Sequence, residues 1–426
     1  MRVSVIIPTR DRAEYLPHSL ATALAIPDGE IEILVSDNAS TDATPDIIAA
    51  QTDPRFRAIA TGRRVSMRQN FEFALEEARG DYVIVFGDDD GILPAQFSNL
   101  LSILERDAPD GLSWDYPVYG WPAPGRGAKA GSFRLVRGRT FGAPEPLDLR
   151  DRRAMLARGQ LHRFHPAPGI YHACMSRRFL RDTLAAPDGT MILARSPDTW
   201  VSMRAIQHGG RFLHCRHPFS LNGFGTRSTG TSFGARGRAE GSHDASANAA
   251  FVTESQADPV EDVIPLAGSV PLGFLSTLET LRHHFPDEDV RIAHVDWYRT
   301  VINDLRKKDA DTANEVMAVM TAHAQATGTD AALDAARARP RSWLVQARAL
   351  WHKNADKLAS IRVDGAAGGV NTIATAVAAL DRALGADYRA VLSGDLARGA
   401  AWTNTRRRND APIRTGADET EQEGQT

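Results

Sequence analysis

The sequence predicts an α/β protein with a doubly wound, mainly parallel sheet and a helical addition on its C-terminal side. Short apolar runs alternate with segments of helical periodicity through roughly the first hundred residues, an order typical of a parallel sheet. After about residue 262 the chain becomes rich in Ala, Leu and Arg, with helical spacing and little strand signal. The length of 426 residues also exceeds that of one typical domain.

Four buried strands are expected in the alternating part, each a short run rich in β-branched or other apolar residues. They cover residues 2–8, 31–37, 55–60 and 81–86. A helix is expected after each strand, because apolar residues recur there every three or four positions. These helices cover residues 13–24, 40–50, 66–78 and 93–104, and Ser66 is the expected N-cap of the third.

Composition and charge limit the kinds of function that the protein can have. Hydrophobic residues make up 42% and charged residues 24%, as in a soluble globular protein with a sizeable core. The net charge of -3 offers no basic face for nucleic acid. The two cysteines cannot form a disulfide framework and fit a reducing compartment. No apolar stretch has the length of a membrane span or a signal peptide, so a cytoplasmic location is expected.

Charged side chains follow three of the expected strands. The strand ends read PTRDR after the first strand, SDNAST after the second and GDDDG after the fourth. Because open α/β sheets bind ligands at the carboxyl ends of their strands, these ends predict a site. Asp88, Asp89 and Asp90 repel one another unless a cation lies among them, and a solvated acidic turn is the alternative. Neither GxGxxG nor GxxxxGK[ST] is present, which disfavours a dinucleotide site and a P-loop.

Three motifs in this order carry a resemblance to a known family. VSVIIPTRDRAEYL, ILVSDNASTDAT and GDYVIVFGDDDGILP closely resemble the nucleotide-diphospho-sugar domain of family 2 glycosyltransferases, which have the Rossmann-like GT-A fold. The firm resemblance covers about the first 105 residues, and a weaker one continues to about residue 233. It implies an inverting enzyme of polysaccharide biosynthesis that moves a sugar from a nucleoside-diphosphate sugar to a hydroxyl of a glycan or lipid-linked acceptor.

The resemblance also implies site residues. The expected nucleotide-sugar contacts are Pro8, Thr9, Arg12, Asp37, Asn38, Arg68, Asn70 and Asp88. The acidic run matches the metal-binding DxD element, which implies Mg²⁺ or Mn²⁺ on Asp88, Asp89 and Asp90. In one departure from the family pattern, the usual first Asp falls on Gly87, and Asp88 is expected to replace it. A hard cation on carboxylates suits the chemistry, because the leaving diphosphate concentrates negative charge.

The second half of the domain is expected to bind the acceptor. Asp198, just before a helix, is implied as the general base, and a helix N-cap is the alternative. The strand-like segment 111–121 carries four aromatic residues that are expected either to stack on sugars or to fill the core: Trp114, Tyr116, Tyr119 and Trp121. His214 or His217 is a candidate for an extra metal ligand. The Gly-rich segment 222–232, with Arg227, is expected either to close over the diphosphate or to be an ordinary surface loop.

The predicted domains are a GT-A domain over 1–262, a helical region over 263–402 and a disordered tail over 403–426. The GT-A domain divides into a nucleotide-sugar half, 1–105, and an acceptor half, 106–262. An amphipathic stripe over 341–363 is expected to pack on the core; contact with the inner face of the membrane is the alternative. Two other functions stay open from the sequence: a nucleotidyltransferase that forms sugar nucleotides and a non-catalytic nucleotide-sugar binder.

Overall fold

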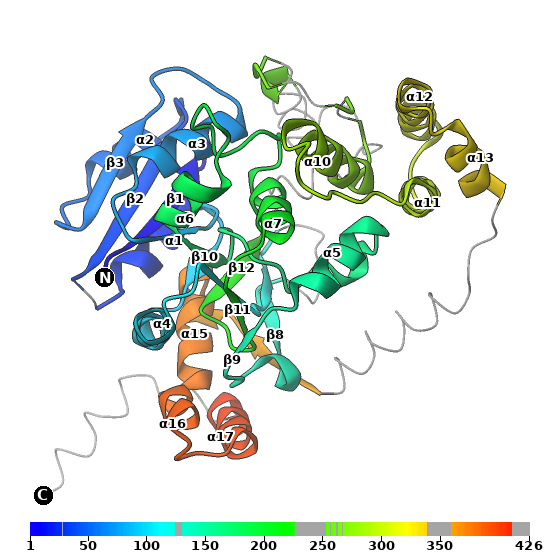
Figure 1. Ribbon diagram of the computed structural model, residues 1–426. Helices are drawn as coiled ribbons and strands as arrows, with labels where there is room; N and C mark the ends of the chain where they lie inside the picture. Colours follow the sequence, from blue (N-terminus) through cyan, green and yellow to red (C-terminus); the bar gives the residue numbers. More distant parts are fainter. Residues whose placement is uncertain are drawn as a thin grey trace, which may run out of the picture.

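An eight-stranded mixed sheet forms the centre of the protein, with helices on both faces (Figure 1). The strand order is β3-β2-β1-β4-β10-β6-β11-β9. The computed structural model describes residues 1–27, 29–123, 130–225, 253–255, 257–260, 263–265, 267–338 and 359–410.

Four neighbouring strands run parallel and form the N-terminal half of this sheet. They are β3 (Phe56–Ala60), β2 (Ile31–Asp37), β1 (Val3–Thr9) and β4 (Tyr82–Val85). The helices that follow them are α1 (Leu16–Leu24), α2 (Thr44–Ala49), α3 (Met67–Glu77) and α4 (Pro94–Asp107). Ser66 caps α3 in a capping box with Gln69. The predicted α/β fold with a mainly parallel sheet is therefore confirmed, together with its order of elements.

The other half of the sheet contains both antiparallel and parallel pairs. Its strands are β10 (Ala173–Ser176), β6 (Gly111–Trp114), β11 (Phe212–Cys215) and β9 (Pro144–Pro146). A smaller sheet joins β5 (Gly91–Ile92), β12 (Ser220–Phe224) and β7 (Val118–Gly120). The strand-like segment 111–121 is thus two strands in two sheets, separated around Pro117, which has no N–H for a strand ladder.

Two hydrophobic cores lie on opposite faces of the sheet, because successive side chains of a strand point to opposite faces. On β1, Val5 belongs to one core and Ile6 to the other. The first core packs α1 and α4 against α15 (Ile373–Leu384), α16 (Asp387–Ser393) and α17 (Arg398–Asp410). The second packs α3, α5 (Leu149–Ala157) and α7 (Pro197–His208) against α10 (Val270–His284), α11 (His294–Leu305), α12 (Ala310–Thr327) and α13 (Asp330–Ala338). Figure 1 shows the C-terminal helices in two groups that lie apart.

The C-terminal region is mainly helical but also contains short strands. β13 (Ser360–Asp364) pairs antiparallel with β8 (Ser132–Val136), and β14 (Ala366–Ala367) pairs with β15 (Val370–Asn371). The end of the amphipathic stripe is therefore a strand, whereas its residues 341–358 lie outside the described residues. Among the helices of the described ranges, none is both long and apolar enough to cross a bilayer.

The predicted disordered tail begins too early. Helix α17 continues to Asp410, because Trp402 and Thr405 are buried against the core. Arg408 also donates hydrogen bonds to the carbonyls of Ala383 and Leu384 at the end of α15. Residues 411–426 lie outside the described residues.

Substitution of Gly91 by Ala is predicted to destabilise the fold, because β5 lies directly against α15. A Cβ at Gly91 would be 2.6 Å from Cγ2 of Val377 and 3.1 Å from Cγ1 of Ile373. The free energy of unfolding should fall by about 1–3 kcal/mol, as expected for overpacking, when measured by denaturant titration. Gly138→Ala is the matched control, since no heavy atom lies within 4 Å of its Cβ position. Val377→Ala in the Gly91→Ala background should restore part of the loss; no coupling between the two changes would contradict the contact.

Candidate active site at the carboxyl edge of the sheet

The ends of β1, β2 and β4 meet at one edge of the sheet. Pro8 and Thr9 at the end of β1 pair with Ser36 and Asp37 at the end of β2. β4 lies on the other side of β1 and leads into a tight turn over residues 87–90. The predicted convergence of the strand ends is therefore present in the structure.

Asp88 is linked directly to the end of β1. Its Oδ2 accepts a hydrogen bond of 2.8 Å from the Thr9 hydroxyl, and its Oδ1 lies 3.6 Å from Nε of Arg12. Burial raises the pKa of the Asp88 carboxyl, while Arg12 and Thr9 oppose the rise. Burial would lower the pKa of Arg12, but Asp88 and Asp89 raise it. Thr9, Arg12, Asp88 and Asp89 thus form one group of interacting side chains.

Gly87 explains the departure from the family pattern. A Cβ at this position would lie 2.9 Å from Oδ1 of Asp89, 3.0 Å from Oδ2 of Asp90 and 3.1 Å from the hydroxyl oxygen of Tyr171. A side chain at residue 87 would therefore push apart the groups that shape the turn. Asp88, one residue later, places its carboxylate beside Thr9 and Arg12 instead.

Both carboxylate oxygens of Asp90 bond other groups within the protein. It is fully buried, and its Oδ1 accepts a hydrogen bond of 2.6 Å from the Gly223 N–H. Its Oδ2 accepts hydrogen bonds from the Gly87 N–H, at 2.7 Å, and from the Tyr171 hydroxyl, and lies 3.2 Å from Nε2 of His172. Protein donors therefore engage both oxygens of Asp90.

The donor set of Asp88 and Asp89 fits a hard divalent cation. Both residues are only 7% exposed, and the main-chain carbonyl of Asp89 accepts a hydrogen bond of 2.8 Å from Trp121. Two adjacent carboxylates at this depth repel each other, and Arg12 contributes one positive charge near them. Carboxylate oxygens are the ligands that Mg²⁺ and Mn²⁺ prefer.

Three of the expected nucleotide contacts are engaged in hydrogen bonds within the protein. Asn38 is buried and bonds both the N–H and the carbonyl of Val65. Arg68 forms a buried ion pair with Asp258, with Nε–O distances of 3.0 and 2.8 Å, and Asn70 bonds Ser36 beneath β2.

Asp37 remains at the sheet edge. Its Oδ1 accepts hydrogen bonds from the backbone N–H and the hydroxyl of Ser40. The structure therefore groups Thr9, Arg12 and Asp88 closely, with Asp37 on the neighbouring strand end.

Asp198 lies in the first turn of α7, and Ser196 occupies the N-cap position. The N-cap alternative for Asp198 is therefore wrong. The Asp198 side chain is exposed, yet the surrounding protein raises the pKa of its carboxyl by burial.

Two tyrosines connect Asp198 electrostatically to the acidic turn. Burial, then Asp90 and then Asp198 raise the pKa of Tyr116 to about 12. Burial and the charges of Asp90, Asp89 and Asp198 also raise the pKa of Tyr171. Both rings are thus close to the acidic turn and to the start of α7. Tyr116 stacks on His172, with 4.4 Å between ring centroids.

Three of the four expected sugar-stacking aromatics fill the core. Trp114, Tyr119 and Trp121 are at most 6% exposed, whereas Tyr116 is half-buried. The core alternative is therefore correct for the three buried rings. Tyr116 is the one of the four that lies near both groups of acids.

The two candidate histidines have different surroundings. His217 is fully buried and stacks on Tyr388 at 3.6 Å, and burial lowers the pKa of its imidazole well below the usual range. His217 is therefore a core residue, and its assignment as a metal ligand is wrong. His214 is half-buried, with Nδ1 3.0 Å from the Ser113 hydroxyl and Nε2 3.6 Å from Asp115.

Sequence reasoning did not identify Tyr171, His172 and His165 as site residues. Tyr171 and His172 contact Asp90, while His165 is exposed near Tyr116, with 6.3 Å between the ring centroids. In the sequence, the only indication of these residues is the adjacent polar pair Tyr171 and His172, just before β10. Arg227 and the remainder of the Gly-rich segment from residue 226 lie outside the described residues.

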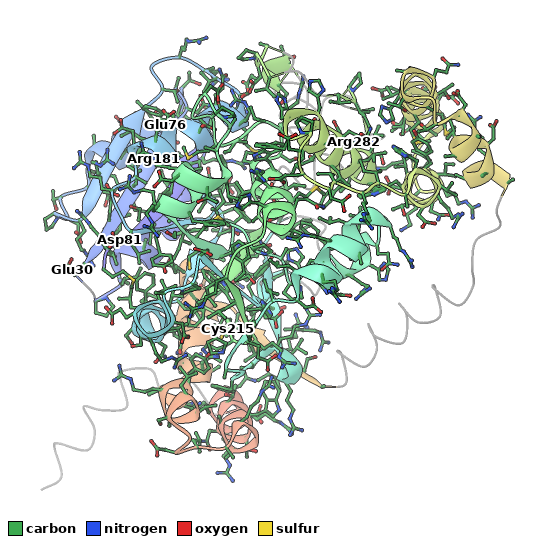
Figure 2. The ribbon with its side chains drawn as sticks, in the orientation of Figure 1. Glu30, Glu76, Asp81, Arg181, Cys215 and Arg282 are labelled. Carbon is green, nitrogen blue, oxygen red and sulfur yellow. The ribbon has the colours of Figure 1, made fainter. Side chains whose placement is uncertain are left out.

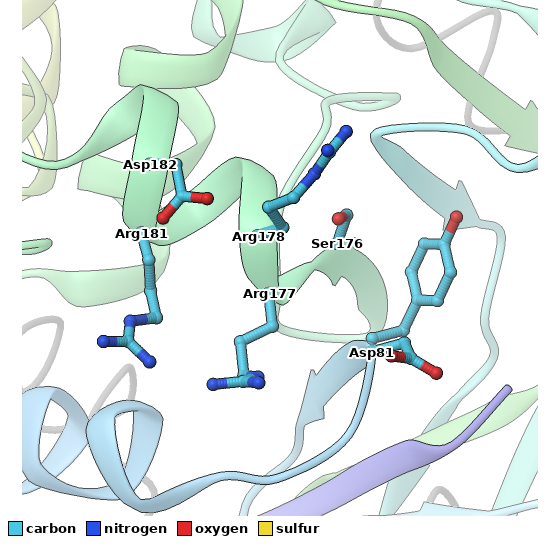
Figure 3. A pocket seen from close by; sticks show the side chains of 7 residues that line it. Asp81, Ser176, Arg177, Arg178, Arg181 and Asp182 are labelled. Atoms are coloured by element: carbon cyan, nitrogen blue, oxygen red, sulfur yellow. The ribbon is translucent and has the colours of Figure 1, made fainter.

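A separate cavity of about 490 Å³ opens at the opposite end of β4 (Figure 3). It is lined by Asp81, Tyr82, Ser176, Arg177, Arg178, Arg181 and Asp182. Asp81 directly precedes β4, whereas the acidic turn follows it, so this cavity is distinct from the candidate site.

Comparison with known proteins finds a matching family model and several similar proteins. The family model described as glycosyl transferase family 2 matches residues 4–143. The succinoglycan biosynthesis protein ExoO of Rhizobium meliloti is 29% identical over 99 residues, which are 23% of this chain and 28% of ExoO. The abequosyltransferase RfbV of Salmonella typhimurium is 34% identical over 116 residues, which are 25% of this chain and 34% of RfbV. The chain thus covers about a third or less of the length of these relatives.

Solved structures also show similarity, at low TM-scores. TarS 1–349 of S. aureus in complex with UDP-GlcNAc has a TM-score of 0.41 and 14% identity, covering 79% of this chain and 92% of that chain. The mannosyltransferase PcManGT of Pyrobaculum calidifontis, in complex with GDP-Man and Mn²⁺, has a TM-score of 0.36 and 16% identity, covering 79% and 86%. The motifs and the family model therefore agree on residues 4–143, the part of the chain that matches glycosyl transferase family 2.

Proposed function

We propose that the protein transfers a sugar, with inversion, from a nucleoside-diphosphate sugar to a hydroxyl of a glycan or lipid-linked acceptor. One observation carries this proposal. Thr9, Arg12 and Asp88 form a charged group at the carboxyl edge of the sheet, and the charges of Asp90 and Asp198 both act on Tyr116 and Tyr171. This arrangement supports a donor diphosphate at the sheet edge and an acceptor base at Asp198.

The donor side is the end of β1 and β4. Arg12 would contact the diphosphate, and Asp37 would contact the nucleoside from the next strand end. Asn38, Arg68 and Asn70 act as positioning residues in this proposal, because their polar groups hold Val65, Asp258 and Ser36.

Asp88 and Asp89 would hold Mg²⁺ or Mn²⁺, and Asp90 would fix the turn that presents them. When bound, the cation supplies positive charge that stabilises the departing nucleoside diphosphate. Gly87 leaves room for this turn, and Arg12 adds charge on the β1 side.

Asp198 would act as the general base. Inversion requires the acceptor oxygen to attack opposite the leaving group and to lose its proton as the bond forms. A carboxyl with a raised pKa is a stronger base than an ordinary aspartate, and burial supplies that shift here. Tyr116, which is half-buried and influenced by the charges of Asp90 and Asp198, would offer an aromatic face to a sugar.

The activity is tested by incubating the protein with a panel of nucleoside-diphosphate sugars and Mn²⁺. Thermal shift identifies the donor that binds, and chromatography measures release of the nucleoside diphosphate with and without candidate acceptors. Release of nucleoside diphosphate supports the proposal. Turnover of nucleoside triphosphate with release of pyrophosphate would instead support a nucleotidyltransferase, and binding without turnover would support a binder.

Asp89 and Asp90 should respond differently to replacement by Asn. Asp89→Asn should abolish turnover and Mn²⁺-dependent donor binding while leaving the melting temperature near that of wild type. Asp90→Asn should also lower the free energy of unfolding, by about 1–3 kcal/mol, because an amide NH₂ would face a protein donor. Asp188→Asn, on an exposed turn, is the control. Full activity of Asp89→Asn, or of wild type in EDTA, would overturn the metal assignment.

Asp198→Asn should lower the transfer rate by about a hundredfold or more, the loss expected for a general base. Donor affinity should persist, because the donor contacts lie at the ends of β1, β2 and β4. A general base acts when it is deprotonated, and the pKa of Asp198 is raised. As the pH is lowered, the wild-type rate should therefore begin to fall at a pH above the usual titration range of an aspartate. Near-normal transfer by the variant would exclude the role, and lost donor affinity would place Asp198 on the donor side.

A further inference from the structure

Three helices outside the candidate active site bring two histidines and a glutamate together. Glu279 lies on α10, His294 begins α11 and His323 lies on α12. Figure 1 shows these helices beside one another, and Figure 2 labels Arg282, one turn beyond Glu279. None of these helices supplies a residue to the site formed by the ends of β1 and β4.

The three side chains have distances close to those of a metal site. Oε1 of Glu279 lies 2.8 Å from Nε2 of His294 and 3.4 Å from Nε2 of His323, and one ligand atom from each residue lies within 4.8 Å of the others. Zinc binds nitrogen and carboxylate oxygen at about 2.0–2.2 Å, so its tetrahedral ligand atoms are about 3.3 Å apart. Small side-chain shifts therefore suffice to surround one ion.

His323 indicates that these contacts are incomplete without a ligand. Its side chain is only 3% exposed, and Nε2 has no hydrogen-bond partner, although it lies 3.4 Å from Glu279. A buried nitrogen without a partner is unfavourable by about 1–3 kcal/mol. If the three side chains only contacted one another, Nε2 of His323 would remain without a partner, whereas a bound metal ion would be coordinated by it.

Arg282 fixes the orientation of the Glu279 carboxylate. Nη2 of Arg282 lies 2.5 Å from Oε2, which leaves Oε1 directed at the histidines. A second group that fixes a ligating carboxylate in this way is a common feature of metal sites.

We propose that Glu279, His294 and His323 bind one Zn²⁺ ion that joins α10, α11 and α12. Two imidazoles and one carboxylate are a ligand set that zinc favours, and the fourth position is left to water. His294, with a side chain that is 13% exposed, is the most accessible of the three ligands. Because the ligands come from three helices, the ion stabilises the packing of this C-terminal group and takes no part in sugar transfer.

The test is a zinc titration of the full-length protein after removal of metal with a chelator. Excess Mg²⁺ is present, so that the oxygen ligands at Asp88 and Asp89 are occupied by a hard cation. Competition with a chromophoric chelator should show one tight equivalent of Zn²⁺ per chain. Glu279→Gln and His323→Asn should each weaken it by about tenfold or more. Substitution with Co²⁺ should give the absorption of a four-coordinate site in wild type, and this absorption should be lost in His323→Asn.

Two controls separate this site from other zinc ligands. His283→Asn changes an exposed histidine on the same helix, and Asp89→Asn changes the acidic turn; both should retain the tight equivalent. A second measurement needs no variant: zinc should raise the melting temperature of wild type relative to EDTA. Absence of a tight equivalent in folded wild type, its persistence in folded Glu279→Gln and His323→Asn, or its loss in Asp89→Asn would overturn the proposal.

Discussion

The carboxylate of Asp90 connects the parts of the chain that form the candidate active site. Its oxygens accept hydrogen bonds from the turn after β4, from Tyr171 before β10 and from Gly223 in β12. A buried carboxylate without donors would be strongly unfavourable, so these segments must take up their relative positions for the charge to be satisfied. The turn that presents Asp88 and Asp89 is therefore determined by contacts with the second half of the domain.

The N-terminal half could be predicted because its signals are local. The strands over residues 31–37 and 81–86 are apolar runs bounded by polar ends, and Ser66 precedes a helix that carries Gln69 at the capping-box position. Parallel strands separated by helices then place Thr9, Asp37 and Asp88 at one edge without further information. The same local reasoning identified Asp198 at the start of a helix.

The other features depend on contacts between residues that are distant in the sequence. Nothing near Arg68 indicates that its partner is Asp258, and nothing near His217 indicates that Tyr388 covers its ring. The sequence also cannot show that Asp90 accepts hydrogen bonds from distant segments, because the three adjacent aspartates are identical in type. The helix α17 was missed for a related reason: a segment with many arginines appears polar until Trp402 and Thr405 are seen against the core.

The contact between β5 and α15 also affects how the protein is made. The residues of α1 and β5 leave the ribosome long before their partners Ile373 and Val377, which lie far along the chain from them. At a synthesis rate of about 5–20 residues per second, the apolar surface that α15 finally covers stays exposed for roughly ten seconds or more. The first hydrophobic core thus cannot close until α15 has been synthesised, and before then the apolar surfaces of α1 and β5 are covered only by transient contacts or by chaperones.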